Sequence, residues 1–260
     1  MKPSGIGGQA VIEGIMMRNK DMYSVAVRKP DGEIEVHLGT YQSIVKSKMI
    51  REIPLVRGVI NFIDSMILGM RTLTFSASFY EEEEEPTKAE VVLDKVTKGN
   101  SEKILTGLTV AFSIVMAVAI FMILPYFLTN FLRDYVVSNT LLAIIEGVVR
   151  VGVFLIYILL ISRMNDIQRV FMYHGAEHKC INCIEHGMEL NVENVLKSSK
   201  HHKRCGTSFL FIVMFVSIIF FIFIRVTSPV LRVVIRLLLI PVIAGVSYEL
   251  IKFAGNSDSK

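Results

Sequence analysis

Four long apolar stretches in the second half of the chain constrain its fold more than any other feature. A helix needs about 20 mostly apolar residues to cross the hydrocarbon core of a bilayer. The stretches are Ile104–Leu128, Leu141–Ser162, Ser208–Ile224 and Val230–Phe253. A hydrophobic content of 52% and a mean hydropathy of +0.51 are also typical of membrane proteins. The pattern predicts an α-helical membrane protein with about four transmembrane helices.

The residues before the first apolar stretch predict a small α+β region. Tyr23–Lys29 and Glu33–Leu38 are β-prone runs joined by the turn sequence Pro30-Asp31-Gly32, which predicts a β-hairpin at about 23–38. Apolar residues then recur with a helical period, which predicts an amphipathic helix at about 54–78. Its polar stripe consists of Arg57, Asn61, Asp64 and Arg71. The helix could lie against the bilayer or under the transmembrane helices, or it could be a core helix of a soluble domain.

These elements divide the chain into six consecutive parts. We expect an N-terminal region (1–80), an acidic linker (81–103), two transmembrane helices (104–162), a polar loop (163–207), two further transmembrane helices (208–254) and a tail (255–260). The block Glu81–Glu85, followed by Pro86, is what identifies the linker, because like charges in a row repel one another.

The distribution of Lys and Arg predicts an orientation. The loop 163–207 is rich in both, whereas Phe131–Thr140 contains only Arg133. Because cytoplasmic loops carry an excess of these residues, we expect that loop and both termini in the cytoplasm. Three arginines in the last connection and the last helix argue against this orientation, because they would lie near the outer surface. Arginine side chains can, however, snorkel outward. The three residues are Arg225, Arg232 and Arg236. A net charge of +4 is modest for a membrane protein, so we expect no nucleic-acid partner.

Chemistry is concentrated between residues 174 and 205, which contain five of the six histidines and all three cysteines. His174 and His178 are four residues apart, so on a helix both imidazoles can reach one ion. With Glu177 they fit the H-x-x-E-H pattern of inverted zincins, in which the histidines bind zinc and the glutamate activates a water molecule. Gly175 weakens the helix that this pattern requires. The segment predicts a metal site with Glu177 as general base.

A second interpretation of the same segment is a structural zinc knuckle. Cys180-x-x-Cys183 and His202-x-x-Cys205 have the ligand types and spacing for such a site, which would fill all four positions around the metal. A hydrolytic site needs three ligands and an open position instead, with His202 or Cys205 as the third. The alternative without a metal is a polar loop next to the membrane.

Three further acidic residues could have functional or purely structural roles. Glu146 and Arg150 form an i, i+4 pair inside the second apolar stretch, where they can neutralise each other and either serve function or fix helix packing. Glu249 lies near the end of the last stretch and can snorkel. Glu13 lies between apolar residues and could bind a ligand or be solvated.

Several motifs in order along the chain resemble the YqhQ-like family of bacterial membrane proteins. They are Gly7-Gly8-Gln9-Ala10-Val11-Ile12-Glu13-Gly14-Ile15-Met16-Met17-Arg18, Pro30-Asp31-Gly32, Arg57-Gly58-Val59, Tyr173-His174-Gly175-Ala176-Glu177-His178-Lys179 and Arg204-Cys205-Gly206-Thr207-Ser208-Phe209. The resemblance covers nearly the whole chain. That family is described as a predicted metal-dependent enzyme of unknown function, so the resemblance implies a metal and a bacterial cell membrane without a reaction.

The resemblance supports a defined set of site residues. They are His174, Glu177, His178, His202 and Cys205. The family's usual pattern has Thr where Cys180 stands and Pro where Lys203 stands. The first difference counts against the zinc knuckle, and the second leaves its neighbours in place.

Two classes of function follow from these patterns. The first is a metal-dependent hydrolase of unknown substrate, with zinc or another divalent transition metal at the cytoplasmic face of the membrane. The second is a non-catalytic membrane factor or scaffold with a structural metal, for example in membrane-protein insertion. The expected partners are the lipid bilayer and, for the scaffold, a membrane-associated protein complex.

Overall fold

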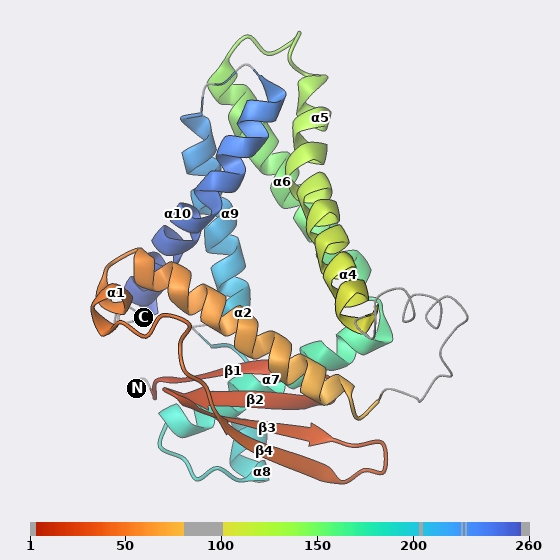
Figure 1. Cartoon of the computed structure of the whole chain (residues 1–260), viewed down its shortest axis with the longest axis vertical. Coiled ribbons are helices and arrows are strands. Elements are labelled where there is room, and N and C mark those ends of the chain that lie inside the picture. Colours follow the sequence, from red (N-terminus) through yellow and green to blue (C-terminus); the bar gives the residue numbers. More distant parts are fainter. Residues whose placement is uncertain (1–3, 81–100, 203–204, 225, 227, 256–260) are drawn as a thin grey trace. The chain divides into compact units, whose positions relative to one another are not determined.

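The computed structural model describes residues 4–80, 101–202, 205–224, 226 and 228–255. Most of the linker expected at 81–103 and all but the first residue of the expected tail lie outside these ranges. The chain is mostly helical, with one small antiparallel sheet near its N-terminus (Figure 1).

The sheet is a meander of four antiparallel strands in the order β1-β2-β3-β4. The strands are β1 (Ile6–Val11), β2 (Gly14–Asn19), β3 (Met22–Arg28) and β4 (Ile34–Thr40). The last two confirm the predicted hairpin. In its turn, Gly32 has a φ of 89° and the Glu33 amide donates to Asp31 Oδ1 at 2.9 Å. The sequence did not predict β1 and β2.

The other regular elements of the described chain are helices. They are α1 (Lys48–Glu52), α2 (Val56–Ala77), α4 (Ser101–Val118), the π-helix η1 (Ala119–Ile123), α5 (Leu124–Asn130), α6 (Asn139–Ile161), α7 (Asn165–Glu185), α8 (Val192–Lys197), α9 (Gly206–Ile222) and α10 (Pro229–Gly255). The segment expected as a polar loop at 163–207 therefore contains a helix of 21 residues, α7.

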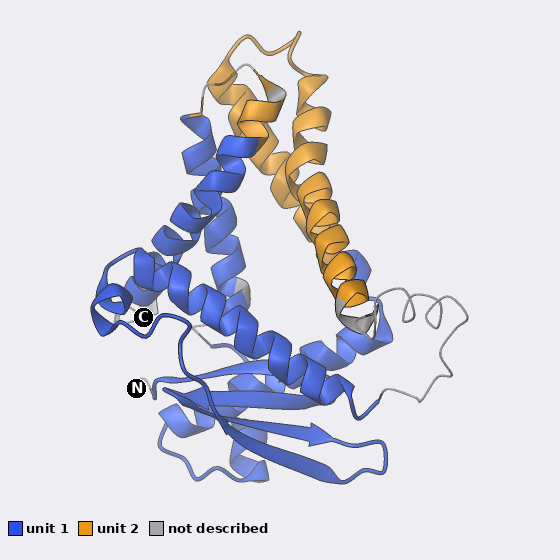
Figure 2. Ribbon diagram, viewed as in Figure 1, with its two compact units in different colours: residues 1–80, 159–223, 234–260 blue, residues 81–158, 224–233 orange. Residues whose placement is uncertain are grey.

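The chain divides into two compact units, shown in different colours in Figure 2. The first comprises residues 1–80, 159–223 and 234–260, and the second residues 81–158 and 224–233. The sheet, α2, α7, α8, α9 and most of α10 belong to the first unit.

Strand β1 lies between two helices, one on each face of the sheet. A Cβ atom on Gly8 would lie 2.5 Å from the Glu177 side chain of α7, and one on Gly69 of α2 would lie 2.5 Å from Gln9 Oε1. Gly8 and Gln9 are consecutive, and consecutive side chains of a strand point to opposite faces. Helices α7 and α2 therefore cover opposite faces of the sheet. The α2 face contains the hydrophobic core, formed by Val11, Met16, Val25, Val27, Tyr41 and Leu68.

Helix α2 confirms the predicted amphipathic helix, but one residue of its predicted polar stripe, Asp64, is buried. Asp64 is 2% exposed and accepts hydrogen bonds from the Tyr41 hydroxyl and the Ile44 amide, each at 3.1 Å. Leu68 is buried one turn further along. This face of α2 therefore lies in the core of the N-terminal region, as the core-helix alternative expects.

The first turns of α2 also contact α10. The Arg57 guanidinium forms a salt bridge with Glu249, and Nε donates to Oε1 at 2.6 Å. Asn61 Nδ2 donates to the Tyr248 hydroxyl at 2.8 Å. Gly58 permits this approach, since a Cβ there would lie 2.8 Å from Tyr248 Cβ. The interpretation of Glu249 as a lone, snorkelling carboxylate was therefore wrong, because it has a cationic partner.

Among the described residues, three helical segments are long and apolar enough to cross a membrane. They are Ile104–Asn130, Asn139–Ile161 and Val230–Phe253, and they coincide with three of the four predicted spans. The remaining segment, Ser208–Ile222, is apolar but shorter. The structure thus supports a membrane protein, while the number of four spans is not confirmed.

A charged pair is buried in the second unit. Arg150 Nη2 donates to Glu146 Oε1 at 3.0 Å, and Arg150 Nε donates to the Phe121 carbonyl at 3.1 Å. Phe121 belongs to η1, and in a π-helix the backbone bonds shift by one residue, which changes which carbonyls are available. The pair therefore joins α6 to η1, which supports the packing role for these two residues.

Candidate metal centre

One face of α7 contains the residues of the site. At 100° per residue, positions 174, 177, 178, 181, 182 and 185 fall on one side of the helix. Glu177, His178, Ile181 and Asn182 are buried there. Helix α7 forms in spite of Gly175 because this face packs against the sheet and against the chain segment that follows α8. Packing thus offsets the cost of about 1 kcal/mol that glycine adds to a helix.

Residues 198–202, which we call the strap, are held along this face by hydrogen bonds to their backbone. His178 Nδ1 donates to the Lys200 carbonyl at 2.8 Å. Asn182 Nδ2 donates to the carbonyls of Ser199 and His201 at 2.7 and 2.9 Å. Cys205 follows the strap in the sequence and lies one residue before α9 begins.

The strap brings Cys205 to the two histidines of α7. His174 Nε2 lies 3.2 Å from Cys205 Sγ, and the rings of His174 and His178 have centroids 4.3 Å apart. One ligand atom from each of the three residues lies within 4.8 Å of the other two. Because His178 Nδ1 carries the proton donated to Lys200, its Nε2 lone pair remains available for a metal.

Glu177 lies between the two imidazoles and is 3% exposed. Its Oε2 atom is 3.2 Å from His174 Nδ1 and 3.7 Å from His178 Nε2. The second contact is too long for a hydrogen bond and the first is not aligned as one, so Oε2 has no hydrogen-bond partner in the described part of the chain. Gly8 of β1 provides the space for this carboxylate. A buried carboxylate oxygen of this kind can accept a further hydrogen bond, for example from a water molecule.

The electrostatics of the cluster favour a cation. The contact with Glu177 raises the pKa of His174 to about 9, and Cys205 acts in the same direction against the effect of burial. In the absence of metal, His174 therefore holds a proton at neutral pH in the position where a metal cation would be bound.

His202 lies beside this cluster and has a different partner. Its Nε2 atom is 3.2 Å from Glu185 Oε2, and Glu185 Oε1 accepts hydrogen bonds from the amide and hydroxyl of Ser4, at 2.9 and 3.0 Å. Of the four predicted ligands, the structure brings together His174, His178 and Cys205, and it places His202 in a link between α7 and the N-terminal segment.

Cys180 and Cys183, the two cysteines that only the alternative zinc knuckle uses, do not join the cluster. Cys183 lies half a turn around α7 from His174, and its thiol faces the carbonyls of Met188 and Glu189, with the shorter contact at 3.4 Å. Cys180 is half-buried. The group of His174, His178 and Cys205 is the only potential metal site of at least three His, Cys, Asp or Glu residues found among the described residues. The knuckle is therefore not formed.

Sequence reasoning missed three residues that shape the site: Gly8, Asn182 and Glu185. The last two continue the periodicity of His174 and His178 along one helical face, so this spacing could have identified them if the segment had been interpreted as a helix. Gly8 lies in one of the motifs quoted above, but no pattern in the sequence indicates that it faces Glu177.

Contacts between the sheet and α7 also settle the position of Glu13. Its carboxylate forms a salt bridge with Arg169 and accepts a hydrogen bond from the Tyr173 hydroxyl at 3.1 Å. These contacts hold the pKa of Glu13 below its usual value, mainly through Arg169. Glu13 is therefore neither solvated nor free to bind a ligand.

The donor set fits a divalent transition metal. Imidazole nitrogen and thiolate sulfur are the ligands preferred by zinc, whereas magnesium and calcium prefer oxygen. The buried Oε2 atom of Glu177 gives an independent sign that the cluster accommodates one more group.

Comparison with known proteins finds relatives whose function is also unknown. Residues 53–260 match the family model described as "Protein of unknown function (DUF1385)". The chain is 34% identical over 252 residues to "Uncharacterized protein YqhQ" of Bacillus subtilis (strain 168), which covers 96% of this chain and 79% of that protein. No solved structure matches.

Proposed function

The chain belongs to the YqhQ-like family, and we propose that it is a membrane metalloenzyme. The proposal rests on the geometry of the chain itself, because the relatives described above have no assigned reaction. His174, His178 and Cys205 bind zinc or another divalent transition metal, and Glu177 acts as general base in a hydrolytic reaction. The observation that carries this proposal is the set of three ligand atoms within 4.8 Å of one another.

Three features favour a catalytic metal over a structural one. The cluster offers three protein ligands, and catalytic zinc sites keep three protein ligands and one open position. Glu177 lies next to that cluster with a carboxylate oxygen that has no hydrogen-bond partner among the described residues. The hydrogen bond from His178 to Lys200 is the kind of outer contact that orients a metal-binding imidazole.

Each residue then has a distinct task. His178 and Cys205 are fixed by the strap, and Glu177 orients His174 through the contact with Nδ1 while it stays close enough to accept a proton from a water molecule. A divalent metal bound there would lower the pKa of such a water so that it becomes a nucleophile near neutral pH.

The proposal includes four transmembrane helices. Helix α9 contains 17 residues, which corresponds to roughly 26 Å at 1.5 Å per residue. This length is at the lower limit of membrane-spanning helices. With four spans, the excess of Lys and Arg in residues 163–207 supports cytoplasmic N- and C-termini in a bacterial cell membrane.

One observation favours the alternative, a non-catalytic scaffold. Long-range contacts brace α7 against the N-terminal segment, through Glu185 with Ser4 and through Arg169 with Glu13. A structural metal would extend this bracing, and the resulting surface would bind a membrane-associated protein complex.

Metal analysis of the purified protein tests the proposal. We expect about one zinc ion per chain in the wild type, and loss of most of it in His174→Ala, His178→Ala and Cys205→Ser, since a missing ligand cannot be replaced at fixed geometry. His201→Ala, which changes an exposed histidine of the strap, is the matched control. Equal metal content in all variants would reject the site.

A further inference from the structure

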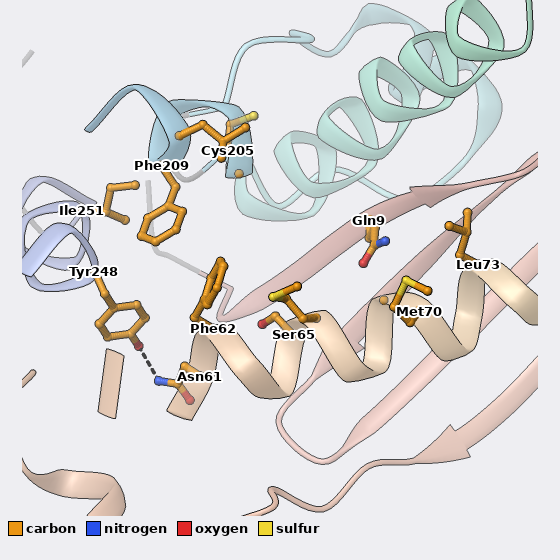
Figure 3. A pocket seen from close by; sticks show the side chains of 14 residues that line it. Gln9, Asn61, Phe62, Ser65, Met70, Leu73, Cys205, Phe209, Tyr248 and Ile251 are labelled. Carbon is orange, nitrogen blue, oxygen red and sulfur yellow. Dashed lines mark hydrogen bonds between the residues drawn. The ribbon is translucent and has the colours of Figure 1, made fainter. Parts of the chain in front are cut away.

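An apolar groove of about 700 Å³ lies next to the metal-ligand cluster (Figure 3). Its walls come from α2, the beginning of α9 and the end of α10, with Gln9 of β1 at one side. Its volume is within the range of about 300–1,000 Å³ that is usual for small-molecule sites. All of its lining residues belong to the first unit.

The groove uses a second face of α2. Phe62, Met66 and Met70 are spaced by four residues and line the groove, whereas Asp64 and Leu68 on the other face are buried against the sheet. Met66 and Met70 are 54% and 53% exposed. In Figure 3, Phe62 and Phe209 of α9 lie next to each other in the lining, with ring centroids 5.8 Å apart. Side chains of this kind leave a flexible apolar surface that no other described residue covers.

The scarcity of polar groups in the lining limits which class of molecule the groove can bind. None of the described residues that line the groove is charged, and Asn61 and Tyr248 already bond to each other at 2.8 Å. An extended peptide in this groove would bury amide groups without enough hydrogen-bond partners, which is unfavourable for each such group. A hydrocarbon chain has no such groups, so an acyl chain fits the lining better than a peptide does.

The elements that form the groove indicate where such a chain would come from. Tyr248 and Ile251 lie in the segment Val230–Phe253, which is apolar enough to cross a membrane, and Phe209 lies in the apolar helix Ser208–Ile222. The groove is thus formed partly by helices whose natural solvent is the bilayer. A membrane lipid is the source of acyl chains in that environment.

The groove is continuous with the metal-ligand cluster through one residue. Cys205 lines the groove, and its Sγ atom lies 3.2 Å from His174 Nε2. We propose that the groove binds an acyl chain of a membrane lipid and directs the polar end of that lipid to the cluster of His174, His178 and Cys205. This inference rests on the proposed function, because it names an acyl lipid as the class of substrate of the proposed metalloenzyme.

Photo-crosslinking of the full chain tests this binding site. The protein is reconstituted in nanodiscs that contain phosphatidylglycerol with a photoactivatable diazirine in one acyl chain, and the labelled peptides are mapped by mass spectrometry. We expect labels on residues 62–73 and 205–210. Met66→Glu with Met70→Glu should lower this labelling by about tenfold, because a carboxylate is poorly tolerated against hydrocarbon.

Two further variants make the result specific. Ile63→Glu changes an exposed residue of the same helix that does not line the groove, so labelling should stay at the wild-type level. Ser65→Trp fills the groove without adding charge and should also lower labelling. It therefore provides a test if the glutamate variant does not fold, as judged by circular dichroism.

The outcomes separate this inference from the proposed function. Equal labelling of the groove and of exposed apolar residues of α4, such as Phe112, with no change in the variants, would show surface lipid only and overturn the inference. Capture of an apolar model peptide but not of the lipid probe would overturn it as well. Metal content is measured in the same samples. A protein without metal that still shows groove labelling would reject the metalloenzyme and keep the lipid site.

Discussion

At the scale of single residues, Glu177 distinguishes an enzyme from a scaffold. It has one structural role, in which a side-chain oxygen contacts His174, and one chemical task that needs a base. Glutamine keeps the size of the side chain and one acceptor oxygen, so it preserves the first role and removes the second.

We therefore predict that Glu177→Gln retains the metal but loses function. General-base catalysis is typically worth about 10²–10⁴ in rate, and this is the expected loss. The measurement is complementation of a strain that lacks its own copy of the gene, read together with metal content. Glu193→Gln, an exposed position of α8, is the control. Full complementation by a metal-loaded Glu177→Gln protein would leave the scaffold as the function.

The raised pKa of His174 predicts how the stability of the metal-free protein depends on pH. An unfolded histidine titrates near 6.5, whereas His174 in the folded protein titrates at about 9. Its protonation therefore stabilises the fold fully below about 6.5, and this contribution is lost as the pH rises through about 9. After chelation of metal, the melting temperature should fall more between pH 7 and 10 in the wild type than in His174→Gln. Parallel curves for the two proteins would contradict this.

At the scale of elements, the site depends on how the strap is held on α7. Asn182 contributes two of the hydrogen bonds that fix the strap, although it is not a ligand. Outer contacts of this kind are typically worth about 10–100-fold in metal affinity. Without them, Cys205 is positioned less accurately relative to the two histidines.

Asn182→Ala should accordingly lower zinc affinity by about 10–100-fold while the helical content stays unchanged. Competition titration with a chromophoric chelator measures the affinity, and circular dichroism measures the fold. Asn165→Ala, at the exposed beginning of α7, should have no effect on affinity. An unchanged affinity in Asn182→Ala would show that the strap does not position Cys205.

The elements also show why some of the fold could be predicted from the sequence and some could not. The hairpin β3–β4 and helix α2 have strong local signals, a turn sequence and a helical period. Helix α7 has a polar composition and contains Gly175, so its stability comes from packing that no local pattern displays. Likewise, the sequence could not distinguish His202 from Cys205 as the third ligand. That choice depends on the path of the strap, which is fixed by residues distant in the sequence.

At the scale of the whole molecule, the accessibility of the cysteines can test the proposed orientation in the membrane. The segment that contains α7 and the strap should face the cytoplasm, because it has the largest excess of Lys and Arg. Cys180 is the most suitable probe, since it is half-buried whereas Cys183 and Cys205 are buried.

We predict that a membrane-impermeant maleimide labels Cys180 in inverted vesicles and not in intact cells. Mass spectrometry of the peptide identifies which cysteine reacted. Unfolded protein in denaturant, in which all three cysteines react, is the positive control. Labelling of Cys180 in intact cells would reverse the proposed orientation.

The space that Gly8 leaves for Glu177 also has a consequence for the order of events during synthesis. Glu177 fits against β1, and the nearby bond between Ser4 and Glu185 joins positions 181 residues apart. The strands therefore leave the ribosome long before their helical partner and before Cys205, which is the last ligand to be made. Throughout that interval, the face of the sheet that α7 will cover is open, and the incomplete cluster lacks a ligand. Under the proposed function, full coordination of a metal is therefore possible only after the first two apolar helices have been synthesised.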